Sequence, residues 1–283
     1  MNAAVTVFFL IIKVFSLYFL AVSLFGLCRR RTPEPAARLR RFAVLIAARN
    51  EESCIAGLIE SLRAQHYPPE LVDIWVLPNN CTDRTAEAAR RAGAQVLEMP
   101  ASVRSKGAAL HTAAKALLRS ARNYDAFCVF DADNEADPAF LSEMNRALDR
   151  TAIVKSRILA KNRTQAGISA CYEIYFCSAN HFLNRAREAV GLSARVIGTG
   201  FAIRRDLLEA LSGFPCRTLT EDAELYAACL CRGARIGYCE TAVTYDEEPV
   251  TWRASLVQRR RWMSGILQVA RLTLPELLAN FLR

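Results

Sequence analysis

The apolar residues of this chain form one long run near its start. Residues 3–27 are apolar except for Lys13 and a few hydroxyl-bearing side chains. A helix rises about 1.5 Å per residue, so this run is long enough to cross a hydrocarbon layer of about 30 Å. A cleaved signal peptide is the alternative, but the start has no basic region and no small-residue cleavage site follows the run. The pattern therefore predicts a single transmembrane anchor over residues 1–28.

Shorter apolar runs then alternate with segments of helical period. The expected strands are FAVLIAA (42–48), VDIWVLP (72–78), AQVLEM (94–99) and AFCVF (126–130). The expected helices between them span residues 53–65, 82–93 and 105–122. Thr82 is the expected N-cap of the second helix and Gly93 its end. This alternation predicts an α/β fold with a mostly parallel sheet that is covered on both faces and binds ligands at the carboxyl ends of its strands.

The second half of the chain alternates less regularly and ends in an amphipathic segment. Residues 197–205 (IGTGFAIRR) predict a turn that leads into a strand, and residues 220–233 predict a helix that opens with acids. Residues 252–274 predict an amphipathic helix that stops before Pro275. The expected organisation is a transmembrane anchor (1–28), a basic juxtamembrane linker (29–41), an α/β domain (42–250) and an amphipathic interfacial helix region (251–283).

The net charge of +9 is concentrated beside apolar segments. Arginines gather at 29–41, which includes Arg29–Arg31, and at 253–261, without the interleaved aromatic residues of a nucleic-acid surface. This distribution favours membrane lipids as partners and argues against nucleic acid. Basic residues beside a span stay on the cytoplasmic side, so we expect a protein of the inner cell membrane with its α/β domain in the cytoplasm.

The cysteines and histidines of the chain do not indicate a metal site. The chain has ten cysteines but no C-x-x-C pair, and its three histidines are far apart in sequence. This spacing argues against a zinc site, and we expect buried free thiols in a reducing compartment.

Two aspartates, Asp131 and Asp133, follow directly after the expected strand at 126–130. Two carboxylates on one side of an extended backbone repel each other, so a positive group is expected between them. Such a pair suits a hard divalent cation that is also held by phosphate oxygens. A solvated acidic turn is the alternative reading.

Two further motifs offer charge at expected helix starts. Lys106 precedes Gly107 where helix N–H groups and an ammonium can hold a phosphate together, although a surface lysine explains it equally simply. In TLTED, Asp222 is a candidate general base, because histidines are scarce. The alternative is a capping box formed by Thr218 and Glu221.

The segment QRRRW places three useful side chains on one helix face. Gln258, Arg261 and Trp262 follow the i, i+3, i+4 spacing, and together they offer stacking area and forked donors for a sugar and a pyrophosphate. Arg259 and Arg260 are expected to point away, toward lipid headgroups. The alternative is a basic helix that only lies on the membrane.

Taken together, these motifs resemble glycosyltransferase family 2, in its membrane-bound branch of cellulose, chitin, hyaluronan and poly-N-acetylglucosamine synthases. The resemblance runs from about Phe42 to Leu272. It is carried by LIAARNEE, NNCTDRTAEAARRAGAQV, SKGAAL, DAD, GTGFAIRR, TED and QRRRW, of which the last three are the most specific as a set.

The resemblance implies a GT-A fold and an inverting transfer from a UDP-sugar, with GlcNAc or glucose favoured, to a saccharide or lipid-linked acceptor. It implies that Asp131 and Asp133 hold Mg²⁺ or Mn²⁺ on the diphosphate, and that Asp222, beside Glu221, is the catalytic base. The positions implied to bind the nucleotide-sugar and acceptor are Asn79, Asp83, Lys106, Asp131, Gln258, Arg261 and Trp262.

The chain departs from this family at three places. Ala47 replaces the proline that relatives usually carry at the end of the first strand. Asn79 stands where relatives carry an aspartate that contacts the uracil. Polymer synthases also continue into further transmembrane helices, so a truncated sequence, a non-processive enzyme and a partner channel all stay open. The alternatives in function are a catalytically degenerate scaffold subunit of a synthase complex and, less favoured, a nucleotidyltransferase, in which TED and QRRRW have no role.

Overall fold

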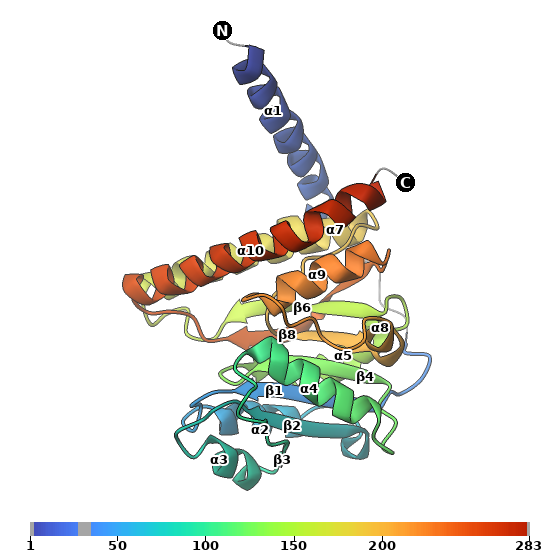
Figure 1. Ribbon diagram of the computed structural model, residues 1–283, viewed down its shortest axis with the longest axis vertical. Helices are drawn as coiled ribbons and strands as arrows, with labels where there is room; N and C mark the ends of the chain where they lie inside the picture. The colour runs from blue at the N-terminus through green and yellow to red at the C-terminus, as the bar shows by residue number, and fades with distance from the viewer. Residues whose placement is uncertain (1–2, 28–34, 282–283) are drawn as a thin grey trace.

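One mixed sheet of eight strands forms the centre of the molecule (Figure 1). The computed structural model describes residues 3–27 and 35–281, so Arg29–Arg31 of the expected linker lie outside the described residues. The strands follow the order β3-β2-β1-β4-β7-β6-β8-β5. Their bounds are β1 Phe42–Ala48, β2 Val72–Pro78, β3 Gln95–Val96, β4 Ala126–Asp131, β5 Glu135–Ala136, β6 Ile153–Ala160, β7 Phe201–Arg204 and β8 Ile236–Asp246.

The sheet has a parallel half and a mixed half. Strands β3, β2, β1 and β4 pair in parallel, as the apolar runs predict. Strand β7 then runs antiparallel to both β4 and β6, while β6 and β8 are again parallel. The mostly parallel sheet is therefore confirmed, and the carboxyl ends of β1, β2 and β4 meet at one edge.

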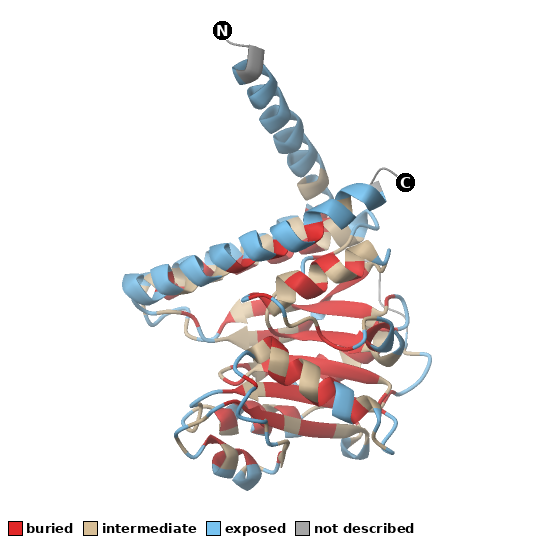
Figure 2. Ribbon diagram, in the orientation of Figure 1, coloured by how far each residue is buried: buried red, intermediate tan, exposed pale blue. Residues whose placement is uncertain are grey.

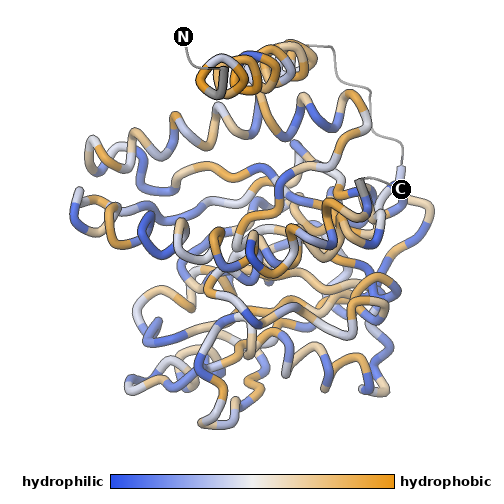
Figure 3. Tube along the Cα trace, turned by 45° about the horizontal axis from the view of Figure 1, so that its top comes forward, coloured by the Kyte–Doolittle hydropathy of each residue, from blue (hydrophilic) through white to orange (hydrophobic). Residues whose placement is uncertain are grey.

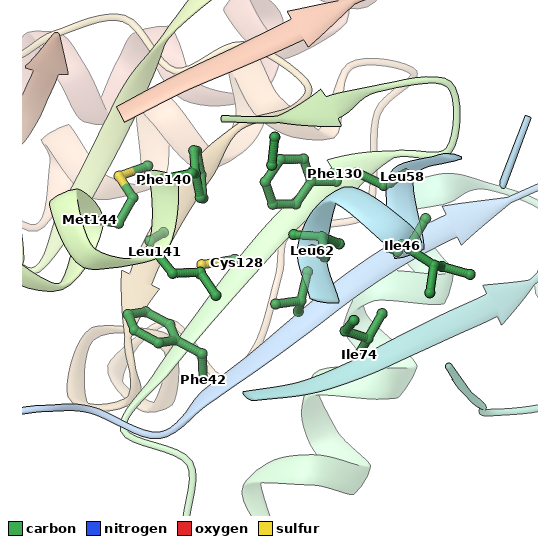
Figure 4. Packing of buried hydrophobic residues seen from close by; sticks show 14 of the residues in the cluster. Phe42, Ile46, Leu58, Leu62, Ile74, Cys128, Phe130, Phe140, Leu141 and Met144 are labelled. Atoms are coloured by element: carbon green, nitrogen blue, oxygen red, sulfur yellow. The ribbon is translucent and has the colours of Figure 1, made fainter. Parts of the chain in front are cut away.

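The central strands are apolar along their whole length because both of their faces are buried. In β1, Phe42, Val44 and Ile46 pack on one face, and Ala43 and Leu45 pack on the other. The first face is covered by α2 and α5 (Figure 4) and the second by α4, α8 and α9. Figure 2 shows the strands as the most buried part of the molecule. A continuous apolar run is what such a two-sided environment requires.

The helices lie on both faces of the sheet and along one end of it. Their bounds are α1 Ala3–Leu24, α2 Ile55–Arg63, α3 Thr85–Arg91, α4 Lys106–Leu118, α5 Phe140–Ala147, α6 Gly167–Ser178, α7 Ala186–Ala189, α8 Arg205–Ala210, α9 Glu221–Cys231 and α10 Trp252–Phe281. Three short segments complete them: the 3-10 turns η1 Phe25–Leu27 and η2 Pro69–Leu71, and a π-helical segment η3 Ala179–Arg185.

Two helix ends differ from the sequence prediction. Helix α3 begins at Thr85, because Thr82 bonds Asn50 and the Asp83 carboxylate accepts the Thr85 N–H instead. Helix α10 continues through Pro275 to Phe281 rather than ending before it. Packing against α9 holds this last segment, where the Asn280 side chain donates to the Cys231 carbonyl at 3.0 Å.

The cysteines that the structure describes are free thiols, as predicted. Cys128, Cys229 and Cys239 are buried, whereas Cys171 on α6 is exposed, so burial was wrongly expected for that residue. Cys28 lies outside the described residues.

Helix α1 rises away from the domain beside the layer that contains α6, α7 and α10 (Figure 1). Among the described residues, Val5–Leu27 is long and apolar enough to cross a membrane. Its apolar side chains are exposed. In Figure 3 the helix is predominantly orange, the colour of hydrophobic residues. Where this helix meets the domain, Gly26 is buried against η3, and a Cβ there would lie 2.5 Å from the His181 carbonyl oxygen.

Candidate active site

Lys106 joins three of the predicted motifs at the carboxyl edge of the sheet. Its ammonium lies 2.5 Å from Asp131 Oδ1 at the end of β4 and 3.3 Å from Glu221 Oε1 at the start of α9. It also donates to the Gly198 carbonyl at 2.6 Å, in the loop before β7. The two carboxylates raise the pKa of Lys106 against the opposing effect of its burial. Lys106 is thus the positive group beside Asp131, and within the described residues no ion pair joins it to Asp133.

Asp222 lies beside this cluster with its carboxylate held by backbone donors. Its Oδ2 accepts the Gly198 N–H and its Oδ1 accepts the Ala223 N–H, both at 2.8 Å. Gly198 therefore touches both motifs, through its carbonyl to Lys106 and through its N–H to Asp222. The structure thus brings DAD, TED and the IGTG turn together around one lysine.

The capping box proposed as an alternative for TLTED is not formed. Thr220 is the N-cap residue of α9 and makes no side-chain capping bond, and Glu221 instead reaches Lys106. The loop is held by Glu224, which is 1% exposed and accepts the N–H groups of Arg217 and Thr218, each at 3.0 Å. Sequence reasoning missed Glu224, because an acid in the first turn of a helix has an ordinary explanation in the helix dipole.

Asp133 carries negative charge that the neighbouring side chains compensate only weakly. Burial and the charges of Asp131 and Glu51 raise its pKa to about 6. Its one recorded side-chain contact in the described chain is a long bond of 3.4 Å from Asn134 Nδ2. Hard oxygen ligands with uncompensated charge fit Mg²⁺ or Mn²⁺. The described residues contain no group of three or more His, Cys, Asp or Glu that could hold a metal ion.

A buried network of hydrogen bonds connects the backbone of Asp131 to the ends of neighbouring strands. The Asp131 N–H lies 3.1 Å from Thr199 Oγ1 and 3.2 Å from Asn134 Oδ1, and Thr199 also donates to Asn134 Oδ1. Asn134 Nδ2 donates in turn to Asp246 Oδ1 at the end of β8, at 2.5 Å. This network fixes the direction in which Asp131 leaves its strand.

Lys155 lies deep in the same region and is 1% exposed. Its ammonium nitrogen is 3.2 Å from both Ser156 Oγ and the Gly200 carbonyl. Burial lowers the pKa of Lys155 to about 7, and burial with the charges of Asp131 and Asp133 raises that of Asp246 to about 7. Sequence reasoning missed Lys155 and Asp246 because it did not predict the strands β6 and β8 that carry them.

Asn79 and Asp83 lie in the loop after β2, and their side chains form hydrogen bonds with residues of this loop and of the loop after β1. Asn79 is 5% exposed, and its Oδ1 accepts the Asn80 side-chain amide at 2.9 Å. The Asp83 carboxylate accepts from Thr85 and from the Glu52 N–H, and these bonds lower its pKa. Among the described residues, no recorded hydrogen bond or ion pair joins these two side chains to Lys106.

The QRRRW segment occupies the first half of α10, facing α6. Gln258 and Trp262 both contact Tyr172 of α6, and Arg261 is exposed beside them. Gln258 and Arg261 line a hollow of about 530 Å³ together with Thr251, Arg253, Ala254 and Val257. Arg259 does not follow the expectation that it points to lipid headgroups, because its guanidinium lies 5.3 Å from the centre of the Tyr172 ring.

Helix α10 also packs directly on the TED loop. A Cβ on Gly265 would lie 2.3 Å from Thr220 Cγ2 and 2.5 Å from Thr220 Oγ1. Three residues further, Gln268 Oε1 accepts the Leu219 N–H at 3.0 Å. On the other side of the loop, a Cβ on Gly107 would lie 2.9 Å from Glu221 Cβ. The loop is therefore held between α4 and α10, with glycine at each point of closest approach.

Comparison with known proteins relates this arrangement to sugar transfer. The family model described as "Glycosyltransferase like family 2" matches residues 40–265. The probable glycosyltransferase YdaM of Bacillus subtilis is 28% identical over 244 residues, which are 82% of this chain and 56% of that protein. The beta-monoglucosyldiacylglycerol synthase of Synechocystis sp. is 26% identical over 233 residues, covering 78% of this chain and 47% of that protein. The chain spans about half the length of these curated relatives.

Solved structures show the same fold at low identity. The mannosyltransferase PcManGT from Pyrobaculum calidifontis, in complex with GDP-Man and Mn²⁺, superposes with a TM-score of 0.73 at 21% identity, over 92% of this chain and 71% of that one. Glucosyl-3-phosphoglycerate synthase from Mycobacterium tuberculosis, in complex with Mn²⁺, UDP and glucosyl-3-phosphoglycerate, gives 0.55 at 22% identity, over 81% of this chain and 80% of that one. The predicted GT-A fold is confirmed.

Proposed function

Because the chain belongs to glycosyltransferase-like family 2 and is a glycosyltransferase, we propose that it moves a sugar from a UDP-sugar to a lipid-linked or saccharide acceptor with inversion. Glucose and GlcNAc are the favoured sugars. The observation that carries this proposal is the cluster around Lys106, in which one ammonium contacts DAD, TED and the IGTG turn within 3.3 Å. A scaffold subunit would not need these three motifs to converge on one lysine.

In the proposed mechanism, Asp222 accepts the proton of the acceptor hydroxyl as that oxygen bonds to the anomeric carbon. The bond from this carbon to the diphosphate oxygen breaks, and UDP leaves with the electron pair. Lys106, which already sits between two carboxylates, contacts the diphosphate. Asp131 and Asp133 would hold a divalent cation, which when bound neutralises charge on the leaving diphosphate.

The remaining predicted residues surround this reaction centre in the proposal. Glu221 keeps Lys106 in place through their 3.3 Å ion pair. Asn79 accepts from the uracil N3–H with an amide oxygen, and Asp83 shapes the loop by capping α3. Gln258, Arg261 and Trp262 bind donor phosphate and acceptor from the α10 side.

A lipid-linked acceptor is favoured by the position of the membrane-spanning candidate. Helix α1 meets the domain at η3 and α7, in the same layer as α10 (Figure 1). Three of the curated relatives are named beta-monoglucosyldiacylglycerol synthase. We therefore propose a protein of the inner membrane whose cytoplasmic domain works on an acceptor at the lipid surface, with a synthase or channel partner as the further alternative.

The function is tested by measuring UDP release in lipid vesicles over a panel of UDP-sugars, with Mn²⁺ or Mg²⁺ and with diacylglycerol or an oligosaccharide as acceptor. We expect release with one sugar, abolished by EDTA and accompanied by a glycosylated product. Pyrophosphate release instead of UDP would indicate a nucleotidyltransferase. Failure to bind Mn²⁺–UDP in calorimetry would indicate the scaffold subunit, for which Asn79 in place of aspartate is the motivation.

The contact between Gly265 and Thr220 gives a prediction for the TED loop. Gly265→Ala would place a methyl group within 2.5 Å of two Thr220 atoms, so the loop that carries Asp222 must shift. We expect kcat to fall roughly 10- to 100-fold, because a misplacement of about 1 Å can cost that much. The matched control is Gly57→Ala in α2, where a Cβ meets no atom within 4 Å and activity should be unchanged. Equal activity of the two variants would show that the loop tolerates displacement.

A further inference from the structure

Tyr172 of α6 contacts three residues of the QRRRW segment, and neither the sequence motifs nor the comparisons point to it. It is 1% exposed and packs with Ile158 and Phe176. The Trp262 ring lies edge-on to it with centroids 6.4 Å apart, and the Arg259 guanidinium lies over it at 5.3 Å. A ring alone would satisfy these contacts, so the reason for a tyrosine must lie in its hydroxyl group.

The hydroxyl group of Tyr172 is part of a short hydrogen-bond chain with two residues of α10. It donates to Gln258 Oε1 at 2.9 Å and lies 3.1 Å from Ser255 Oγ. A phenol has one proton, so when it is given to Gln258 the serine must be the donor in the second bond. Ser255 is itself 1% exposed, which leaves Tyr172 as a buried link between the two helices.

The bond to Tyr172 engages the oxygen end of the Gln258 side chain. With Oε1 on Tyr172, the amide –NH₂ group makes no hydrogen bond within the described residues, and Gln258 lines the 530 Å³ hollow. The charged side chains that line it are Arg253 and Arg261, whose guanidinium groups can only donate. The hollow therefore presents N–H donors, which suit phosphate oxygens or the oxygens of a sugar.

We propose that Tyr172 is a positioning residue: it fixes the Gln258 amide so that its –NH₂ group, with Arg261, binds phosphate or sugar oxygens of a substrate in the hollow. This inference rests on the proposed function. Tyr172 itself touches no substrate, and its effect passes through Gln258. Its loss should weaken binding more than it slows the chemical step, because Gln258 holds the substrate before and during the reaction.

The test is a double-mutant cycle between Tyr172→Phe and Gln258→Ala, with UDP release as the measurement. Tyr172→Phe keeps the ring contacts and removes the hydrogen bonds of the hydroxyl group to Gln258 and Ser255, so we expect KM to rise roughly fivefold with kcat little changed. In the Gln258→Ala background the same change should have no further effect, since the group it positions is gone. Tyr175→Phe is the matched control: this tyrosine lies one turn along α6, is 46% exposed and should leave KM unchanged. Equal and additive losses in both backgrounds, or a lower kcat at constant KM, would indicate a purely structural role and overturn the inference.

A second measurement does not depend on turnover. The chain has five glutamines, so ¹⁵N-glutamine labelling gives few side-chain amide signals, and Gln258→Ala assigns the one of interest. Tyr172→Phe should shift and narrow this signal as the amide gains freedom, while Tyr175→Phe should not. An unchanged Gln258 signal in Tyr172→Phe overturns the inference even if no UDP-sugar is turned over, whereas turnover failure of the wild-type protein overturns only the proposed function.

Discussion

Asp222→Asn is expected to lower kcat about 10³-fold while the KM for the UDP-sugar changes little, because the variant loses the proton acceptor. The asparagine –NH₂ group cannot accept the Ala223 N–H that Asp222 Oδ1 accepts, but the bond that ties the side chain to the IGTG turn can be kept. The asparagine side-chain oxygen can still accept the Gly198 N–H that Asp222 Oδ2 accepts at 2.8 Å, so the IGTG turn keeps its bond to α9. Lys106, Asp131 and Glu221 remain paired as before. The loss should therefore appear in the chemical step and in its pH dependence, and not in nucleotide binding.

The matched control for this change is Asp206→Asn on α8. Asp206 is an exposed aspartate that pairs with Arg204 at the surface, where an ion pair contributes about 0–1 kcal/mol to the free energy of unfolding. The activity of the Asp206→Asn variant should equal that of the wild-type protein. Both the Asp206→Asn and the Asp222→Asn variants should keep the wild-type affinity for Mn²⁺–UDP in calorimetry. An Asp222→Asn variant that retains more than about a tenth of the wild-type kcat would exclude this residue as the base.

The parallel half of the fold could be predicted from the sequence because each element there obeys a local rule. The runs 42–48 and 72–78 coincide with β1 and β2, since a strand buried on both faces is apolar throughout. The half beyond β4 could not be predicted in the same way. Strand β6 carries Lys155 and Arg157 within IVKSRILA, so it is not a continuous apolar run. It pairs over most of its length with β8, which lies more than seventy residues later in the chain. Such pairings depend on contacts that no local pattern reveals.

The residues of the candidate site likewise fall into those that a local pattern predicts and those that it does not. Asp131, Asp222 and Lys106 were found because their motifs lie at strand ends and helix starts, where the fold class predicts ligands. The groups that hold them were not found. Glu224, which holds the TED loop, and Tyr172, which holds Gln258, look like ordinary helix residues in the sequence. Tyr172 meets Gln258 only when the helices α6 and α10 pack together, and Glu224 bonds back to the loop just before its own helix. Reading motifs therefore predicts the candidate reacting groups and misses the residues that hold them.

Asp133→Asn is expected to change activity and stability in opposite directions. Without a metal, Asp133 is a half-buried carboxylate beside Asp131, and burial with this repulsion raises its pKa to about 6. An amide of nearly the same shape removes the repulsion, so the metal-free variant should unfold at a temperature equal to the wild type or roughly 2–4 °C above it, the shift that about 1 kcal/mol produces in a domain of this size. A group that costs stability where it stands is typical of a site kept for function.

The same variant should lose its response to the metal. In the wild-type protein, Mn²⁺ with UDP at a hundred times its Kd should stabilise the folded state by about 2.7 kcal/mol, and this shift should vanish in Asp133→Asn together with at least about 99% of the activity. Glu135→Gln is the control, because Glu135 is an acid two residues further on, at the start of β5, whose carboxylate instead pairs with Lys161 at 2.8 Å. It should keep both the thermal shift and the activity. If Asp133→Asn retained the Mn²⁺–UDP shift, the cation would have to be held by other oxygens, and the assignment of the DAD motif as the metal site would be wrong.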